Sequence, residues 1–363
     1  MKCPSKTLTA LAVTAFLAPI AADAAKVNVK ISGQINRAAT YADNDIEDDV
    51  VFVDNNASGT RIRLTGDTEL PSGNKAGVHW ETQYQDNSSS AIDVDSGDSS
   101  SEFNSRFREI WFSGAWGKLY LGQGNGAANG TAETDLSGTF IINNADTNLG
   151  DGISFRATGP GVDNTGAVVV RGDSLTGSNV GGFDGLSRND RVRYDTPKLG
   201  PLVLSGDVGQ DKFELAARMR AEVGGGGTFA WAASYYDSDD NGVGGDRDAW
   251  VTSASVLFGN GFNVTGGIGK RKPDAGTDSE WYYVKVGQMF GADHAHKVVV
   301  SYRQKDDFDR RDDEVKEYGL GYLYNMDDYG VELYAGVYQR ELDRPGVPVG
   351  DITLVHAGSR IKF

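Results

Sequence analysis

The chain has 363 residues, with 35 Lys and Arg against 51 Asp and Glu, and a formal net charge of −16 at pH 7. This acidic balance argues against a nucleic-acid-binding surface, which needs clustered positive charge. Cys3 is the only cysteine and there are four histidines, so the sequence offers no disulfide, no thiolate metal site and no support for triad catalysis.

The N-terminal segment predicts an export signal. Two early lysines precede an apolar run, Leu8 to Ile20, which is too short to span a bilayer, and a small-x-small cleavage pattern follows at 22–24. We therefore expect a signal peptide at 1–24 and a mature domain at 25–363. No later apolar stretch approaches the length of a membrane-spanning helix, so a mature chain in a membrane would have to be a closed barrel.

The mature sequence alternates apolar and polar residues from end to end, as β-strands with one apolar and one wet face do. In the first strand Val27, Val29 and Ile31 share one face, and Asn28 and Lys30 share the other. We predict sixteen strands, at 27–38, 59–70, 76–86, 104–114, 117–123, 189–197, 201–210, 212–222, 228–237, 248–258, 261–270, 280–290, 296–305, 314–325, 330–341 and 352–363.

The links between these strands alternate in length. Short links carry turn residues, as in Pro71 to Asn74 and Gly259 to Gly261, whereas long links such as 43–54 and 86–102 are polar and acidic. The brief link at 210–212 is the one exception. An outer-membrane barrel has short periplasmic turns, longer external loops and an even strand count, which places both termini in the periplasm.

One link, from Gly124 to Arg188, is far longer than an ordinary loop and so indicates a functional segment. It contains two strand-like pieces, 153–155 and 168–170, which counted as an extra hairpin would give eighteen strands. We favour an inserted third external loop that folds into the lumen.

The polar faces of the strands carry too many charges for a packed core, because burying unpaired charges costs several kcal/mol each. Such residues must face water, and sixteen strands form a barrel too wide for side chains to fill. The lumen-facing positions include Arg191, Arg193, Arg218 and Arg220. An apolar outside and a wet inside define an all-β, sixteen-stranded antiparallel transmembrane β-barrel that acts as a channel.

Several segments resemble Gram-negative general porins of the trimeric, sixteen-stranded kind. Phe52 to Arg61 (FVDNNASGTR) is similar to that family's second strand, Gly117 to Gln123 (GKLYLGQ) to its fifth, and Arg191 to Pro197 (RVRYDTP) to its sixth. Phe363 resembles the terminal aromatic residue read by the barrel-assembly machinery. The resemblance covers the whole mature chain and implies a homotrimer in a lipid bilayer that contains lipopolysaccharide.

A porin filter of this kind opposes acidic residues on the infolded loop to basic residues on the wall. The loop lacks the Pro-Glu-Phe-Gly-Gly signature of the family, so no motif assigns its filter residues. We expect Phe140 to Ile142 to anchor the loop, and Arg37 to face the lumen only if a bulge shifts its strand's alternation. The candidate constriction residues are Glu133, Asp135 and Asp146 on the loop, and Arg37, Arg61, Arg63, Arg106 and Arg108 on the wall.

The predicted function is passive diffusion of ions and small polar solutes, with a lean toward cations and no catalysis. A surface-exposed adhesin or structural β-barrel is the alternative, and a β-rich hydrolase is disfavoured because the acids are spread over loops and lumen. No cofactor is expected, although Ca²⁺ could bind the acidic loops at 93–98 and 306–314.

Overall fold

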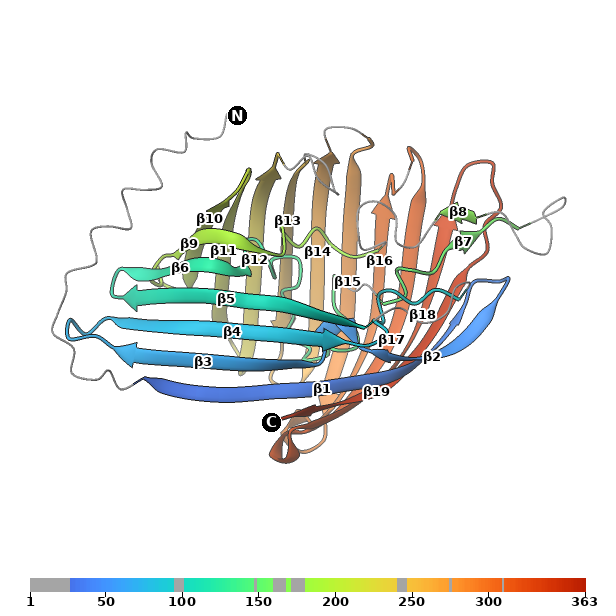
Figure 1. The fold of residues 1–363 in the computed structure, drawn as a ribbon. Helices are drawn as coiled ribbons and strands as arrows, with labels where there is room; N and C mark the ends of the chain where they lie inside the picture. The colour runs from blue at the N-terminus through green and yellow to red at the C-terminus, as the bar shows by residue number, and fades with distance from the viewer. Residues whose placement is uncertain are drawn as a thin grey trace.

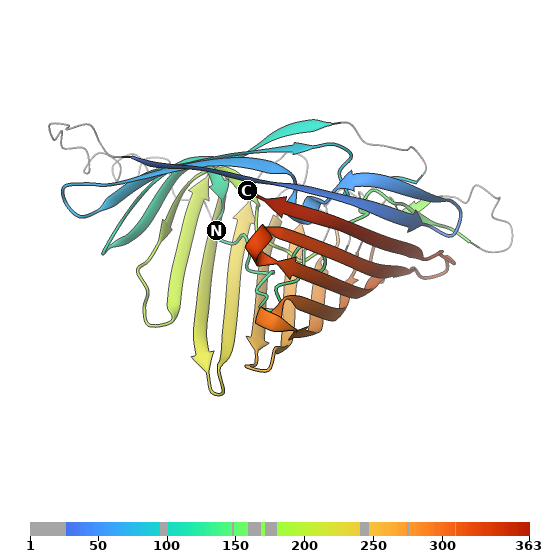
Figure 2. The same cartoon turned by 90° about the horizontal axis from the view of Figure 1, so that it is seen from below.

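The computed structural model describes residues 27–94, 101–146, 149–158, 168–170, 180–239, 247–273, 276–308 and 310–363. Antiparallel strands form one continuous sheet that closes into a barrel, and the strands of its opposite walls cross steeply, as tilted barrel strands do (Figures 1 and 2). Within the described ranges no helix is long and apolar enough to cross a membrane.

The barrel wall contains 17 strand segments. They are β1 (Asn28–Asp43), β2 (Asp48–Asp54), β3 (Arg61–Glu69), β4 (Lys75–Gln85), β5 (Glu102–Gly114), β6 (Gly117–Asn125), β9 (Arg188–Asp195), β10 (Leu202–Gly209), β11 (Lys212–Val223), β12 (Gly227–Ser238), β13 (Arg247–Leu257), β14 (Phe262–Pro273), β15 (Ser279–Phe290), β16 (His296–Asp306), β17 (Glu314–Met326), β18 (Val331–Asp343) and β19 (Ile352–Lys362).

β2 and β3 together occupy one position in the wall, because both pair with β1. The C-terminal half of β1 (37–43) pairs with β2, and its N-terminal half (28–34) pairs with β3. The 3₁₀ turn Asn56–Ser58 separates β2 from β3. The barrel therefore has sixteen strands, as predicted. The predicted boundaries agree with the observed ones to within a few residues, except in the first hairpin.

In that first hairpin the prediction of a long loop at 43–54 is wrong. β1 continues to Asp43, and a tight turn leads directly into β2. The density of acids around residue 48 suggested a loop, but Val51 and Val53 are buried while Val50 and Phe52 point outward. That alternation continues the strand pattern through the acidic sequence.

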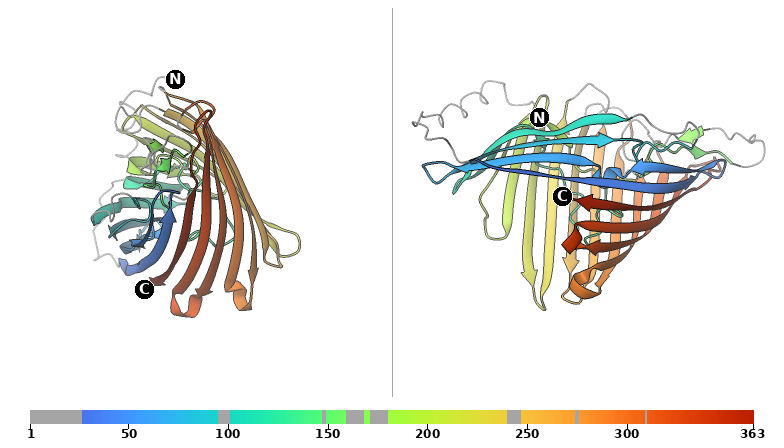
Figure 3. Two further views of the ribbon diagram at one scale, coloured as in Figure 1. Left: turned by 90° about the vertical axis from the view of Figure 1, so that its right-hand side faces the viewer. Right: turned by 60° about the horizontal axis from the view of Figure 1, so that its bottom comes forward.

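The two ends of the wall meet at the β1–β19 seam, where Figure 3 shows the blue first strand beside the red last strand. The last residue extends this pairing: the Gly33 N–H donates to the Phe363 carbonyl at 2.8 Å, and the Phe363 N–H donates back at 3.0 Å. The Phe363 ring lies where a side chain at Gly33 would project, since a Cβ there would come within 2.7 Å of it. Gly33 therefore makes room for the terminal ring.

The outer and inner faces of the wall differ as the sequence predicts. Large apolar side chains such as Ile31, Leu215 and Val300 are more than half exposed on the outer face, where a bilayer would cover them. Along β18, Glu332 and Arg340 are buried on the inner face, whereas Leu333 and Val337 are exposed on the outer face. The inner face is polar, and the long loop covers part of it.

The strand-like pieces inside the long loop do not enter the wall. β7 (Phe155–Arg156) and β8 (Val168–Val170) pair with each other in a separate two-stranded sheet, and the Arg156 carbonyl accepts from the Gly350 N–H in the link between β18 and β19 at 2.9 Å. β6 instead pairs directly with β9, from Lys118 opposite Asp195 to Asn125 opposite Arg188. The eighteen-stranded alternative is therefore excluded.

Candidate pore constriction

The first part of the long loop runs along the inner wall and bonds to one strand after another. The backbone N–H of Ala127 donates to Asp207 on β10. Thr131 bonds to Ser234 on β12 at 2.6 Å, and Leu136 N–H donates to Ser255 on β13 at 3.0 Å. Further contacts on β16 and β18 are made by the Asn143 amide to Ser301 and by Tyr338 to the Ile142 carbonyl. The loop therefore narrows the lumen along β10–β18 (Figures 1 and 2).

Lys285 on β15 is the central anchor of this loop. Its ammonium group is fully buried and donates to the Asp135 carboxylate at 2.8 Å, to the Asn143 carbonyl at 2.8 Å and to the Thr139 hydroxyl at 3.3 Å. Burial by itself would raise the pKa of Asp135, but Lys285 and two bonds from Ser137 outweigh it and lower that pKa. Asp135 is thus an ionised group that holds the loop against the wall.

A second anchor lies on β16–β18. Arg340 donates to Glu317 at 2.6 Å and to the Leu149 carbonyl at 2.5 Å, and its other nitrogen lies 3.5 Å from Asp151. Arg303 approaches the same Glu317 at 3.2 Å. The predicted apolar anchor forms here as well, because Ile141 and Ile142 are buried against this wall, whereas Phe140 is exposed.

The opposite wall gathers arginines around one carboxylate. Glu81 on β4 has no solvent exposure and accepts from Arg61 at 3.4 Å, from Arg63 at 2.7 Å and from Arg106 at 2.7 Å. Arg63 keeps 42% of its side chain exposed, so its charge still faces the lumen. Arg188, at the start of β9, is close enough to Arg106 and Glu81 to interact with both. We call these four arginines, with Glu81, the basic wall.

Three further loop carboxyl groups, Glu133, Asp146 and Asp184, are close enough to interact with one another. Burial and the neighbouring carboxylates raise the pKa of Glu133 well above its usual range. The same causes, with Lys305 opposing them, raise the pKa of Asp146 to about 7. Burial raises the pKa of Asp184 despite backbone N–H bonds from Gly130 and Ala132. Glu133 also interacts with Arg188 of the basic wall.

Two of the predicted wall residues do not face the lumen. Arg37 lies on the outward face of β1, beside exposed Ile35, and bonds to Asp54 at 2.9 Å. The pairing of β1 with β2 and β19 contains no register shift, so no bulge redirects Arg37. Its placement in the constriction was wrong because the alternation of the strand is unbroken there.

The prediction for Arg108 is also wrong, in this case because a bulge interrupts the alternation of its strand. A β-bulge in β5 lets Glu81 pair with Phe107 and Thr82 pair with Ser105, so that Arg106 is the extra residue. Arg106 therefore reaches the lumen, while Arg108 lies on the outer face and donates to Gln123 at 2.8 Å. Arg106 and Arg108 are two residues apart and would share a face in an unbroken strand, but the bulge directs them to opposite faces.

The remaining lumen arginines lie where predicted, on inward positions of β9 and β11. Arg191 is buried and donates to Glu109 at 2.7 Å. Arg193 pairs with Asp195 at 2.8 Å, and Arg218 donates to the Asn129 carbonyl of the loop at 2.6 Å. Arg220 is exposed on the same face of β11 as Arg218.

Sequence reasoning missed Glu81, Lys285 and Arg188. Glu81 and Lys285 stand at inward positions of predicted strands, so parity could have placed them in the lumen. Nothing in the sequence shows that three arginines meet at Glu81 or that Lys285 lies under the loop.

The loop at 93–98, proposed for Ca²⁺, lies mostly outside the described residues. Around residues 306–314, Asp313 bonds to Arg344 at 2.9 Å, and Glu314 pairs with Lys316. No cluster of metal-ligating side chains occurs in the described part of the chain. The Ca²⁺ site stays a prediction.

A closed barrel with an apolar exterior, a charged interior and a loop across its lumen defines a membrane channel. The chain matches the Gram-negative porin family over residues 7–345 and belongs to that family. It is thus an outer-membrane channel for solute diffusion. No curated protein sequence matches it.

Solved porin structures share the fold at low sequence identity. The anion-selective porin from Comamonas acidovorans is 20% identical, with a TM-score of 0.62, covering 93% of this chain and 100% of that one. OmpT of Vibrio cholerae is 11% identical, with a TM-score of 0.59 and coverages of 95% and 99%. The outer membrane channel DcaP of Acinetobacter baumannii is 15% identical, with a TM-score of 0.56 and coverages of 96% and 100%.

Proposed function

We propose that the channel passes ions and small hydrophilic solutes unchanged, and that it sorts them by a transverse field at the constriction. The observation that carries this proposal is the gathering of Arg61, Arg63 and Arg106 on Glu81. The loop on the other side of the lumen carries the interacting carboxyl groups of Glu133, Asp146 and Asp184. Opposed charges across a narrow aqueous gap orient dipolar solutes and disfavour apolar ones.

The test is the reversal potential of the double variant R61Q/R63Q in a planar bilayer under a salt gradient. Neutralising two cations of the basic wall should shift this potential toward cation preference. The matched control R310Q/R311Q removes the same number of charges from the external link between β16 and β17, and should shift it much less. Equal shifts of the reversal potential in the two variants would show that the basic wall does not set the ion preference.

We further propose that the ion preference depends on pH and favours cations only when the loop carboxyl groups are ionised. The four arginines of the basic wall are then balanced by Glu81, Glu133, Asp146 and Asp184, and the acidic surplus of the chain, with a net charge of −16, favours cations. Protonation of the loop carboxyl groups leaves the basic wall unbalanced, which favours anions.

We propose that the channel is a homotrimer, inserted by the barrel-assembly machinery through Phe363 and surrounded by lipopolysaccharide on its outer side. One similar structure, of Vibrio cholerae OmpT, is described as a trimer form. Electrophoresis with and without boiling tests the trimer, because an oligomer that resists detergent should dissociate only on heating. A single band at the monomer position in unheated samples would reject it.

A further inference from the structure

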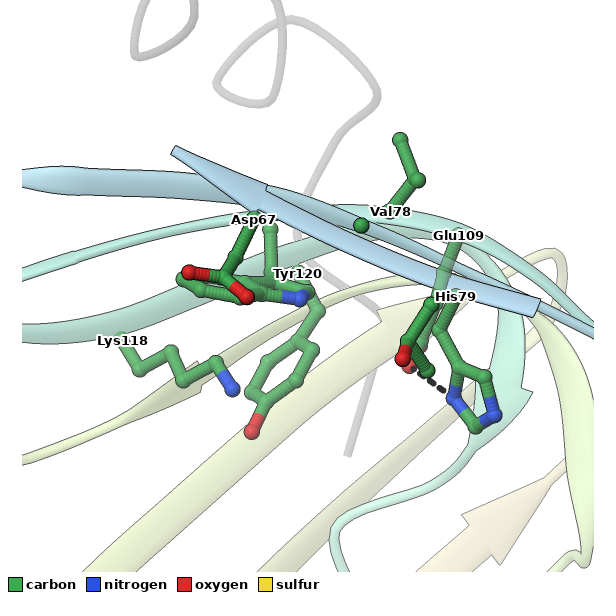
Figure 4. Close-up of a pocket in the computed structure, with 9 residues that line it drawn as sticks. Asp67, Val78, His79, Glu109, Lys118 and Tyr120 are labelled. Atoms are coloured by element: carbon green, nitrogen blue, oxygen red, sulfur yellow. Dashed lines mark ion pairs between the residues drawn. The ribbon is translucent and has the colours of Figure 1, made fainter. Parts of the chain in front are cut away.

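A cavity of about 330 Å³ opens from the lumen on the inner face of β3–β6 (Figure 4). Its charged and aromatic lining comprises Asp67, His79, Glu109, Trp111, Lys118 and Tyr120. Asp67 and Lys118 lie near the short turns of their hairpins, so the cavity lies closer to the periplasmic end than Glu81 does. The cavity therefore lies on the periplasmic side of the constriction. The cavity volume is at the lower end of the range for ligand pockets.

Asp67 and Lys118 carry opposite charges in this cavity without neutralising each other. Among the described residues, neither side chain forms an ion pair or a hydrogen bond. The Lys118 ammonium instead lies over two aromatic faces, 4.1 Å from the centre of the Trp111 ring and 4.6 Å from that of Tyr120. Figure 4 shows Lys118 and Tyr120 together on one side of the cavity, with His79 and Glu109 on the other.

The other charged groups in the cavity already have partners. Glu109 accepts from Arg191 at 2.7 Å, and His79 lies 3.4 Å from the same carboxylate. His79 also stacks on Phe107, with ring centres 4.2 Å apart. These contacts hold Glu109 and His79 in place, which leaves one carboxylate and one ammonium available to a solute, beside an aromatic surface.

We propose that this cavity is a binding subsite for small zwitterions with an apolar side chain, such as free amino acids. The Asp67 carboxylate receives the solute's ammonium group, Lys118 receives its carboxylate, and the rings of Trp111 and Tyr120 contact its apolar part. Binding of both charged ends favours zwitterions over solutes that carry only one of the two charges. The proposal rests on the channel function and deepens it by naming a solute class.

The experiment measures solute-induced fluctuations of the KCl current through single channels in a planar bilayer. The probe is L-leucine, which carries both charges. Leucinamide keeps only the ammonium, N-acetyl-leucine keeps only the carboxylate, and glucose carries neither. The wild-type channel should show saturable binding of leucine, weaker binding of leucinamide and N-acetyl-leucine, and no saturation with glucose.

Two variants separate the two ends of the site. D67N and K118M should each weaken leucine binding about tenfold, because each removes one charged contact. Leucinamide should be affected only by D67N, and N-acetyl-leucine only by K118M. The controls E69Q and K75M neutralise inward-facing residues that face each other across β3 and β4 outside the cavity, and should bind leucine as the wild type does.

Leucine binding that is absent, that is matched by glucose, or that is unchanged in both D67N and K118M would overturn the subsite. The KCl conductance of the same channels reports the pore itself. An open channel without leucine binding would reject the subsite and leave the channel function intact, whereas a membrane without conductance would reject both.

Discussion

The two walls of the lumen use buried charge in different ways. On β3–β5, three arginines share the single carboxylate of Glu81, which leaves a positive surplus beside the lumen. On β15–β18, cations such as Lys285 and Arg340 are fully buried and bound to the loop or to Glu317. The first arrangement creates a field, and the second fixes a loop. Residue type alone does not distinguish the two arrangements, because the role of each cation depends on whether a carboxylate of its own balances its charge.

Removing a loop anchor should have the largest effect. K285M leaves the Asp135 carboxylate buried without its partner, which costs about 3–5 kcal/mol. We expect that loss in the free energy of unfolding measured in detergent, together with a noisier and larger single-channel current as the loop detaches.

The double variant K285M/D135N should recover part of this stability, since it removes both charges of the pair. The exposed lysine variant K75M is the control and should unfold as the wild type does. If K285M were as stable as K75M and conducted in the same way, Lys285 would not be an anchor.

Changing pH should have the next largest effect, through the loop carboxyl groups. A carboxyl group with a raised pKa loses its negative charge as the pH falls through that value, which is about 7 for Asp146. Between about pH 8 and about pH 6, cation preference should therefore decrease, as read from the reversal potential.

The variant E133Q/D146N should favour anions over the whole interval and show a much weaker pH dependence. D163N/D173N removes two acids from the same loop, at positions far along it in sequence from Glu133, and is the matched control. A pH dependence that survives unchanged in E133Q/D146N would assign the titration to other groups.

The smallest effect separates two arginines that are neighbours in sequence. R106Q removes a guanidinium bonded to Glu81 and should shift the reversal potential toward cations. R108Q removes an outward-facing charge that bonds to Gln123 and should leave the potential unchanged. Equal shifts would mean that the bulge in β5 does not direct the two side chains to opposite faces.

Much of the fold could be predicted because alternation at a period of two is a local signal. The apolar face of the first strand can be identified without knowing its partner strands, because Val27, Val29 and Ile31 alternate with Asn28 and Lys30. The count of sixteen followed from summing such signals. The hairpin at 43–54 was missed because its acids resemble loop residues, although the alternation continues through Val50 to Val53.

The site could be predicted only in part, because parity fails at a bulge and says nothing about pairing across space. Arg61, Arg63 and Arg106 were chosen for their charge and position, but Arg108 was chosen by the same rule and faces outward. The loop acids were proposed from composition, which could not separate Asp135, bound to Lys285, from Glu133 and Asp146. That distinction requires the path of the loop across β10–β18.

The seam between β1 and β19 sets the order in which the chain can fold. The first strand has no permanent neighbour on one side until the final residues are made, since Gln34 pairs with Lys362 and Gly33 with Phe363. A contact over nearly the whole length of the polypeptide is slow to form. Until that contact forms, the two edge strands of the open sheet present unpaired backbone groups, which other chains can join, so closure of the seam also removes the edges at which the chain could aggregate.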